Sequence, residues 1–249
     1  MTTGFASYTL YICILSTLLN GCAAPGEIIR AEPSQPRWGY PYSYRVYLPP
    51  CFSADTEARY PILYLVPGRS SAPDAWFAAG LAEVTDRLIL SVEIPPLIIV
   101  TTENIESDPL AEIIYEELIP SVETQYPIAD DRIYRAVAGG LLGGIAAYRL
   151  AYQHPGTFFG AGIFGAGAIS REKQQIEAWL SSLDDTNRIR VFMDGGDKDI
   201  FMLARAEVMK TVLDEAGIEN QLHIRLGGHN YAYWVGNLEM YLKWMTRDW

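Results

Sequence analysis

Residues that bind metals or nucleic acids are scarce in this chain of 249 residues. It has three histidines and three cysteines, and no cysteine pair accompanies His154, His223 or His229, so we expect no metal site and no cofactor. The 19 lysines and arginines are outnumbered by 30 acidic residues, which gives a formal net charge of −11. No basic run is present to neutralise phosphates, so we expect no nucleic-acid partner.

Charge is absent from the N-terminal segment as far as residue 26, and residues 5–19 are mostly apolar. This apolar run is shorter than the roughly 20 residues of a membrane-spanning helix, but it suits the hydrophobic region of a signal peptide. It ends in Leu19-Asn20-Gly21-Cys22, which resembles the lipobox of bacterial lipoproteins. We therefore predict a lipoprotein-type signal at residues 1–21 and a lipid on Cys22. The alternatives are an ordinary secretory signal and a short uncleaved anchor.

This signal predicts where the protein resides and how its cysteines are used. We expect an exported protein, periplasmic or at the cell surface, that meets the membrane only through its lipid anchor. Cys13 lies inside the predicted signal and Cys22 would carry the lipid. Cys51 would then stand alone, so the sequence predicts no intramolecular disulfide.

The rest of the chain alternates between strand-like and helix-like segments. An apolar content of 49% can fill a substantial core, and we predict a linker over residues 22–39 followed by one domain over residues 40–249. Strands are expected at 42–48, 62–66, 97–101, 133–138, 158–163, 188–193 and 221–226. Helices are expected at 79–90, 110–122, 145–154, 171–183, 201–216 and 231–245. Such alternation predicts an α/β fold with a mostly parallel central sheet and helices on both faces.

Three loops that follow predicted strands carry polar or reactive residues. They are Pro67-Gly68-Arg69-Ser70-Ser71, Asp194 to Asp199, and Gly227-Gly228-His229-Asn230-Tyr231. A fourth turn, Gly139-Gly140-Leu141-Leu142-Gly143-Gly144, joins a strand to a helix. Loops at the carboxyl ends of parallel strands meet at one edge of a sheet. The chain order of elbow, acid and histidine is the order of an α/β-hydrolase triad.

Four longer segments make the resemblance specific. They are VYLPPCFSADTEARYPILYLVPG, EELIPSVETQYPI, AVAGGLLGGIAAYRLAYQHPGTFFGAG and GGHNYAYW. In this order, over about 190 residues, they resemble the putative esterase family of α/β-hydrolases. That family contains feruloyl esterases, enterochelin esterases, S-formylglutathione hydrolase and the mycolyltransferases. The resemblance implies the α/β-hydrolase fold and a carboxylic ester hydrolase ancestry.

The resemblance also implies a role for individual residues of a catalytic triad. His229 occupies the position of the general base. Asp199, in the G-x-x-D pattern that begins at Gly196, fits the acid that orients it, with Asp194 and Asp197 as rivals. The nucleophile position is occupied by Leu141, which has no lone pair with which to attack a carbonyl.

Two further positions concern the oxyanion hole. The resemblance places its backbone N–H donors at Leu142 and at a residue near Arg69. Pro67 stands where the family carries a histidine, in the loop after the strand predicted at 62–66. With the serine absent as well, we predict a pseudoenzyme, in which the esterase fold serves a binding or scaffold role.

Two alternatives stay open at this stage. Ser70 or Ser71 could serve as an unusual nucleophile with His229, although serine beside glycine and proline is ordinary in turns. The cleft that serves as the family's active site could also bind a small-molecule ester or a glycan through its aromatic residues. For these residues we prefer the interpretation that they belong to the core. Those aromatic residues are Trp76, Tyr231, Tyr233 and Trp234.

The elbow itself yields a structural expectation. A nucleophile elbow holds its central residue at a strained positive φ. A leucine in that conformation is an outlier. We expect Leu141 either to retain this strain or to sit in a relaxed turn with φ below zero.

Overall fold

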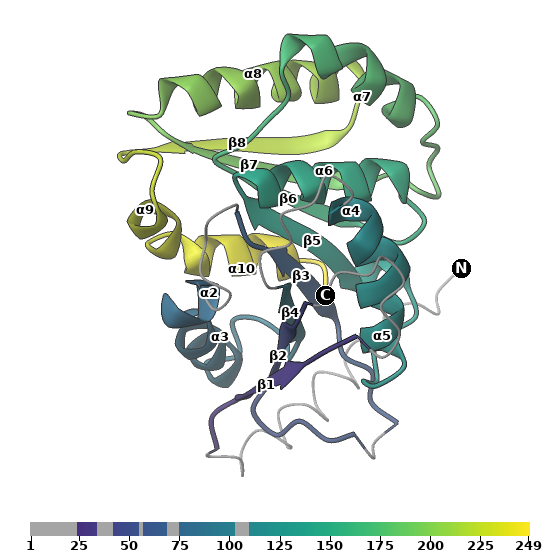
Figure 1. The fold of residues 1–249 in the computed structure, drawn as a ribbon, viewed down its shortest axis with the longest axis vertical. Helices are drawn as coiled ribbons and strands as arrows, with labels where there is room; N and C mark the ends of the chain where they lie inside the picture. The colour runs from purple at the N-terminus through teal and green to yellow at the C-terminus, as the bar shows by residue number, and fades with distance from the viewer. Residues whose placement is uncertain (1–23, 34–41, 55–56, 69–74, 103–109) are drawn as a thin grey trace, which may run out of the picture.

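A single eight-stranded sheet runs through the part of the chain that the computed structural model describes, which is residues 24–33, 42–54, 57–68, 75–102 and 110–249 (Figure 1). Its strand order is β1-β2-β4-β3-β5-β6-β7-β8. The strands are β1 (Glu27–Ala31), β2 (Tyr44–Leu48), β3 (Ile62–Val66), β4 (Ile98–Thr102), β5 (Arg135–Gly140), β6 (Gly160–Phe164), β7 (Arg190–Gly196) and β8 (Glu219–Arg225). All neighbours from β4 to β8 pair in parallel, whereas β1 and β2 run antiparallel at one edge. The α/β prediction with a mostly parallel sheet is confirmed.

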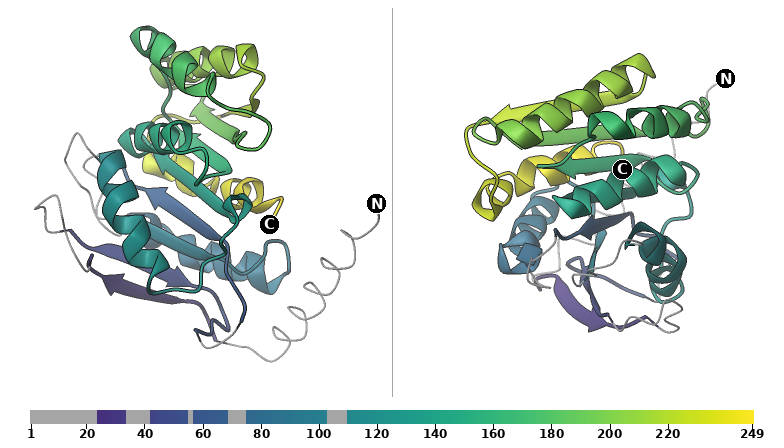
Figure 2. Two further views of the ribbon diagram at one scale, coloured as in Figure 1. Left: turned by 90° about the vertical axis from the view of Figure 1, so that its right-hand side faces the viewer. Right: turned by 45° about the horizontal axis from the view of Figure 1, so that its top comes forward.

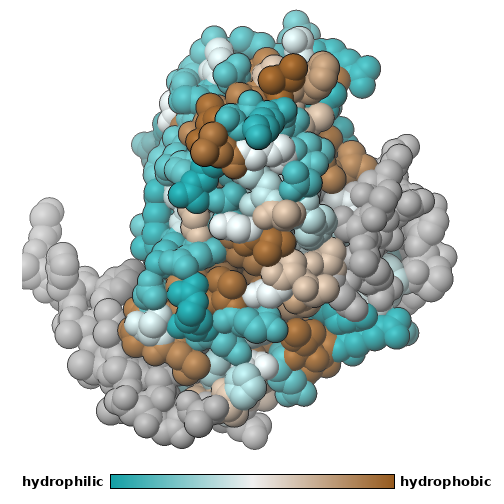
Figure 3. Space-filling view, turned by 90° about the vertical axis from the view of Figure 1, so that its left-hand side faces the viewer, coloured by the Kyte–Doolittle hydropathy of each residue, from teal (hydrophilic) through white to brown (hydrophobic). Residues whose placement is uncertain are grey.

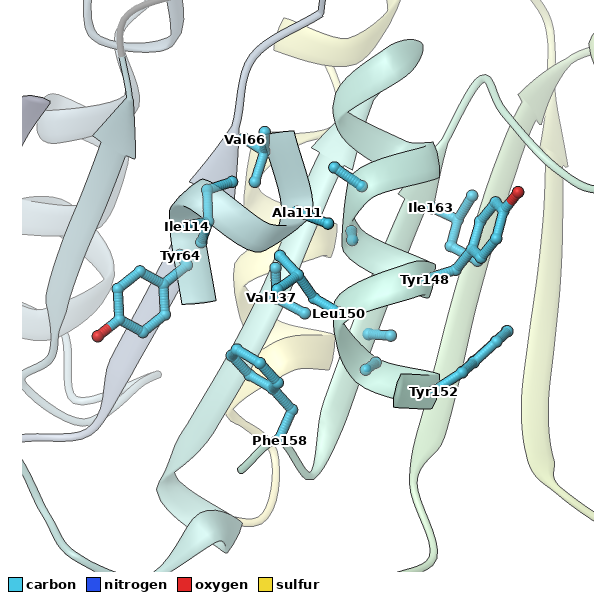
Figure 4. Close-up of a cluster of buried hydrophobic side chains, with 14 of the residues drawn as sticks. Tyr64, Val66, Ala111, Ile114, Val137, Tyr148, Leu150, Tyr152, Phe158 and Ile163 are labelled. Carbon is cyan, nitrogen blue, oxygen red and sulfur yellow. The ribbon is translucent and has the colours of Figure 1, made fainter. Parts of the chain in front are cut away.

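Helices cover both faces of this sheet, as predicted (Figure 2). One face carries α2 (Ala75–Ala78), α3 (Leu81–Leu90), α9 (Tyr231–Val235) and α10 (Leu238–Thr246). The other carries α4 (Leu110–Ile113), α5 (Ile119–Glu123), α6 (Leu142–Gln153), α7 (Lys173–Leu180) and α8 (Ile200–Glu215). Each face has its own buried apolar cluster. Figure 4 shows the cluster under α6, where Leu150 points toward Val137 of β5 and Tyr148 and Tyr152 point toward β6 and β7.

Two predicted helices are interrupted in the structure. The helix predicted at 110–122 contains a π-helical turn, Ile114–Leu118, between α4 and α5. Pro120 lies in the first turn of α5, and its missing N–H removes one helical hydrogen bond at this point. The helix predicted at 231–245 breaks at Gly236, where Asn237 donates a side-chain hydrogen bond to the Tyr233 carbonyl oxygen at 2.8 Å and α10 begins.

Two N-terminal predictions are wrong. Residues 27–31 fall within the predicted linker, but they form β1, which pairs with β2 over five residues. A strand this short on a sheet edge gains its stability from a partner 17 residues away, which local pattern does not show. Cys51 is disulfide-bonded, whereas we predicted no intramolecular disulfide. Cys13 and Cys22 lie outside the described residues, as does the rest of the predicted signal.

The end of α3 carries a strained residue. Val92 has a φ of 59°, although its side chain is branched at Cβ and is 67% exposed. Backbone hydrogen bonds hold the turn, from Val92 N to the Ile89 carbonyl and from Glu93 N to the Leu88 carbonyl, both at 2.9 Å. A left-handed residue in this place is normally glycine.

Replacing Val92 by glycine should therefore stabilise the protein. Removing left-handed strain is worth about 1–2 kcal/mol, less about 0.5–1 kcal/mol for the greater freedom of glycine in the unfolded chain. Thermal unfolding should show a rise of about 1–4 °C for a chain of this size. Leu90→Gly, two residues earlier inside the helix, is the matched control and should lower the melting temperature. A fall for both variants would contradict the strain at Val92.

Candidate active site

The carboxyl ends of five parallel strands bring the predicted site residues to one edge of the sheet. The register aligns Val66 with Gly139, Gly140 with Phe164, and Gly196 with Arg225. The loops that follow β3, β5, β7 and β8 therefore start side by side, and these are the loops singled out in the sequence. Figure 3 views the molecule from the side on which these loops lie. Its hydrophobic areas are separate and interspersed with hydrophilic ones.

Leu141 occupies a sharp turn between β5 and α6. Its φ of 56° and ψ of −120° place it in a region that residues other than glycine rarely enter. The turn is fixed on both sides, because Leu141 N donates to the Phe164 carbonyl at 3.0 Å and Ile145 N donates to the Leu141 carbonyl at 3.2 Å. The strained version of our expectation is confirmed, and the relaxed turn is excluded.

Glycines around this turn allow β3, β5 and α6 to approach closely. A Cβ at Gly143 would lie 2.2 Å from the Val66 carbonyl oxygen, and one at Gly139 would lie 2.5 Å from the Gly143 carbonyl carbon. A Cβ at Gly144 would lie 2.9 Å from that of Ala166. No side chain fits at these distances. The glycines thus allow the close packing of the sharp turn that carries Leu141.

The Leu141 side chain fills the space between the elbow and the loop after β3. It is half-buried and packs against the cluster that contains Trp76 and Trp234. Its Cδ1 and Cβ atoms lie 3.0 and 3.1 Å from the position that a Cβ on Gly68 would take. Gly68 follows Pro67 directly, so the leucine contacts the start of the loop after β3. Hydrocarbon lines this side of the elbow, and it offers no group that could attack an ester.

His229 and Asp199 are in contact. The Nδ1 atom of His229 and the Oδ2 atom of Asp199 form a short hydrogen bond. Asp199 is 9% exposed and caps α8, where its Oδ1 accepts from Met202 N at 3.4 Å. The His229 side chain is 34% exposed. A buried carboxylate thus holds one ring nitrogen of a partly open imidazole and leaves the other nitrogen for solvent or a ligand, which is the pairing of a base and its orienting acid.

The two rival aspartates have other partners. Asp197 accepts the Gly227 backbone N–H at 2.9 Å, and its own N–H donates to the Arg225 carbonyl at 2.8 Å. It therefore ties the loop after β7 to the loop after β8. Asp194 is fully buried and accepts from the Tyr233 hydroxyl at 3.0 Å. Among the three, Asp199 alone is paired with His229.

Asp194 gives the fold a measurable pH dependence. Burial raises the pKa of its carboxyl from the ordinary 3.8 to about 6, against opposing hydrogen bonds from tyrosines. The folded state therefore holds this proton up to a higher pH than the unfolded state. The stability that this proton contributes is complete below pH 4 and is lost as the pH rises through 6.

Asp194→Asn should remove this pH dependence, because the amide keeps an acceptor for Tyr233 and does not titrate. Relative to the parent, the free energy of unfolding of the variant should rise between pH 4 and 7, by about 3 kcal/mol at the upper limit. Urea titrations of both proteins at pH 4.5 and 7.5 measure this difference. The other titrating groups are the same in both proteins, so their contributions cancel. Parallel pH profiles for the two proteins would contradict a raised pKa at Asp194.

The aromatic residues considered for ligand binding lie mostly in the core. Trp76 is 2%, Trp234 3% and Tyr233 8% exposed, and Tyr231 is half-buried. Trp234 contacts both the histidine loop and the end of β5. Its ring lies 5.4 Å from that of His229, centroid to centroid, and it packs against the backbone at Gly140 and Gly165. The preferred interpretation of these residues as core holds for three of the four.

Arg69, Ser70 and Ser71 lie outside the described residues, and so does Cys22. Leu142 is described. It is the first residue of α6, so its backbone N–H has no acceptor within the helix. Its side chain is 39% exposed. No cluster of three or more metal-ligating side chains occurs in the described segments, and none of their helices combines the length and hydropathy needed to cross a bilayer.

Sequence reasoning missed the residues that hold the histidine loop in place. Asn230 caps α9 by accepting the Tyr233 N–H at 3.0 Å, and Tyr233 also anchors to Asp194. An asparagine ahead of a helix is a known N-cap signal, so the first could have been found. The pairing of Asp194 with Tyr233 joins residues 39 positions apart, and nothing local in the sequence indicates it.

Comparisons with known proteins agree with this geometry. The family model described as "Putative esterase" matches residues 36–245. The endo-1,4-beta-xylanase/feruloyl esterase of Xylanibacter ruminicola is 25% identical over 157 residues, which cover 57% of this chain and 20% of that protein. An uncharacterized protein of Corynebacterium glutamicum is 19% identical over 238 residues, 81% of this chain. The chain thus spans between a fifth and about half of the length of these curated relatives.

Solved structures extend the likeness to the whole fold. A ferulic acid esterase superposes with a TM-score of 0.78 at 25% identity, covering 90% of this chain and 99% of that one. The feruloyl esterase module from Clostridium thermocellum, complexed with sinapinate, gives 0.75 at 20% identity and covers 91% and 90%. With its parallel sheet, its elbow and its histidine–aspartate pair, this chain belongs to the putative esterase family of α/β-hydrolases.

Proposed function

We propose that this chain is an exported, non-catalytic member of its family that uses the esterase fold for binding or as a scaffold. The observation that carries the proposal is Leu141 in the conformation of a nucleophile elbow. An aliphatic side chain supplies no nucleophile, and no change of rotamer or pH can create one. Losing the nucleophile of an intact triad costs about six orders of magnitude in turnover.

The surroundings of Leu141 support the same proposal. Its side chain fits against Gly68, where a substrate carbonyl would approach the loop after β3. The loop has Pro67 in place of the family's histidine. Two differences from the family pattern, at Leu141 and Pro67, are more consistent with a site that no longer catalyses a reaction than with a single altered residue.

Hydrolysis assays test this proposal directly. We expect the parent chain to hydrolyse p-nitrophenyl acetate and feruloyl esters no faster than a His229→Ala variant does. Clear turnover that disappears with His229 would refute it.

A second candidate function rests on the intact contact between His229 and Asp199. An oriented imidazole could activate another hydroxyl. Ser70 and Ser71 are the candidates, because they follow Gly68 closely in the sequence. A fluorophosphonate probe that labels the parent chain, and fails to label Ser70→Ala or Ser71→Ala, would favour this ester hydrolase. Absence of any adduct would favour the binding role.

The ligands of related proteins suggest a class of compound that the cleft could bind. The solved neighbours include proteins in complex with sinapinate and with ferulic acid, so hydroxycinnamates are the first class to test here, ahead of a glycan. Binding measured by calorimetry, with loss on His229→Ala, would support a small-molecule ligand. A chain that binds neither compound would be left with the scaffold role.

Export is supported by two features of the cysteines. The apolar segment ends at Cys22, and Cys51 is disulfide-bonded, as is common outside the reducing cytosol. These features compete, however. If the signal is cleaved before Cys22, that residue is the sole other cysteine of the mature chain, and one sulfur cannot carry both a lipid and a disulfide.

Mass spectrometry of the mature protein without reduction separates these outcomes. A lipid on Cys22 supports the anchored lipoprotein, and a linked peptide joining Cys22 to Cys51 supports an ordinary secretory signal. An uncleaved chain retained in the cytosol would contradict export.

A further inference from the structure

The last strand of the described sheet, β8, has one free edge. It pairs with β7 in parallel over seven consecutive residues, from Glu219 to Arg225, and forms the end of the strand order. In Figure 1 it lies at the end of the sheet away from β1, with α8 over one of its faces. The segment contains no proline and its register has no bulge. A straight edge strand of this length is a template for pairing with another chain.

The side chains of β8 are more exposed than those of the inner strands. Ile224 is 48% exposed, and the Glu219 side chain is 64% exposed although it contacts Arg247. On the side of α10, the edge borders a shallow groove of about 610 Å³ that is lined in part by Arg225, Trp244 and Arg247. Most of the other residues that line this groove belong to α10, so the open space lies between the end of β8 and that helix.

We propose that β8 pairs with β8 of a second copy of this chain, antiparallel about a two-fold axis at Leu222. This register follows from the sequence of the strand, Glu219-Asn220-Gln221-Leu222-His223-Ile224-Arg225. Antiparallel pairing centred on Leu222 places residue 219 opposite residue 225 of the second copy, 220 opposite 224, and 221 opposite 223. The two sheets then continue as one across the axis, and the contact closes as a dimer.

Charge complementarity on the α10 side favours this register. Residues 219, 221, 223 and 225 share one face of the strand. The two-fold axis places Glu219 opposite Arg225 of the second copy, and by symmetry Arg225 opposite Glu219, so two opposite-charge pairs form per dimer. Arg225 hydrogen-bonds the neutral side-chain oxygen of Asn237 at 2.7 Å, so a carboxylate beside it adds a favourable interaction.

The α8 side of the strand supplies apolar contact. Leu222, which packs against the cluster beneath α8, meets its own copy at the axis. Ile224 lies opposite Asn220 of the second copy and next to that leucine pair, which covers part of its exposed surface. The interface therefore combines an apolar centre with charged ends.

The other edge of the sheet does not offer the same match. A two-fold pairing of β1, Glu27-Ile28-Ile29-Arg30-Ala31, would place Glu27 opposite Ala31 and Ile28 opposite Arg30. No opposite charges meet, and the strand is two residues shorter. Of the two edge strands of the described sheet, β8 is therefore self-complementary in charge and β1 is not.

Cysteine cross-linking tests the register. In the full-length chain, Leu222→Cys should form a disulfide-linked dimer on mild oxidation, because residue 222 meets its own copy at the axis. Asn220→Cys alone should give no more dimer than the parent chain, whose own cysteines set the background. A mixture of Asn220→Cys with Ile224→Cys chains should cross-link. Equal cross-linking of the Leu222→Cys and Asn220→Cys chains, or none in any variant, would overturn the proposal.

A matched pair of surface variants tests the association without cysteines. Ile224→Arg places a cation opposite Asn220 of the second copy, whose side-chain oxygen lies 3.5 Å from Lys210 Nζ. It should raise the dimer dissociation constant at least tenfold in sedimentation equilibrium. Ile28→Arg on β1, where the isoleucine is 44% exposed, should leave it unchanged. A monomeric parent chain at all concentrations, or equal effects of the two variants, would refute β8 pairing.

Discussion

Replacing Leu141 by serine should raise the rate of ester hydrolysis by about 100-fold or more over the parent chain. The hydroxyl would stand at φ 56° on the elbow. His229 remains held by Asp199, and the first N–H of α6 remains free of any helical acceptor. If His229 and Asp199 have the roles that the resemblance implies, this arrangement suits acyl transfer. We expect less than the six orders of magnitude that a triad serine is worth, because Pro67 still lacks the polar side chain of its family counterpart.

Three control variants separate this gain from other effects of the substitution. Leu141→Ala removes the bulk of the leucine without adding a hydroxyl and should stay at the parent rate. Adding His229→Ala or Asp199→Ala to Leu141→Ser should abolish most of the gain. Initial rates on p-nitrophenyl acetate and labelling by a fluorophosphonate probe give two independent measurements. A folded Leu141→Ser chain with neither turnover nor labelling would show that the loops are no longer arranged for chemistry.

Much of the fold could be predicted because its strands are apolar and lie between clear turn signals. The strand at 62–66 and the helix over 200–215 match the predictions almost residue for residue. Strand β5 extends two residues past the predicted end at Ala138, through Gly139 and Gly140. Glycine is a poor strand former, but here close packing against α6 and the loop after β3 requires it. Tertiary contact, and not propensity, determines where this strand ends.

The site could be predicted only in part, for a related reason. The order of loops on a parallel sheet was enough to bring His229 near the aspartates at the end of β7 and just beyond it. The choice among these aspartates depends on burial, because Asp194 faces the interior beside Tyr233 and Asp199 caps α8. The disulfide at Cys51 was missed because the cysteine count placed Cys13 inside the signal and a lipid on Cys22. Local pattern carries neither kind of information.

Replacing Gly143 by alanine should cost about 3 kcal/mol of stability or more. The added Cβ would lie 2.2 Å from the Val66 carbonyl oxygen and 2.7 Å from that of Pro67. Both contacts are to backbone atoms, so no side chain can rotate away, and α6 must move off β3. Thermal unfolding should show a fall of about 6–12 °C for a chain of this size. The loss would be large because the clash lies where the helix is tied to the sheet.

Gly156→Ala is the matched control for Gly143→Ala. Gly156 follows α6 in the same part of the chain, and an added Cβ there has no heavy atom within 4 Å. Its stability should change by less than about 0.5 kcal/mol. In Gly143→Ala, the displacement of α6 should also reduce the activity gained by Leu141→Ser, since the elbow lies between β5 and this helix. If Gly143→Ala were as stable as Gly156→Ala, the close contact between α6 and β3 would be wrong. The elbow could then not be held strained by the glycines around it.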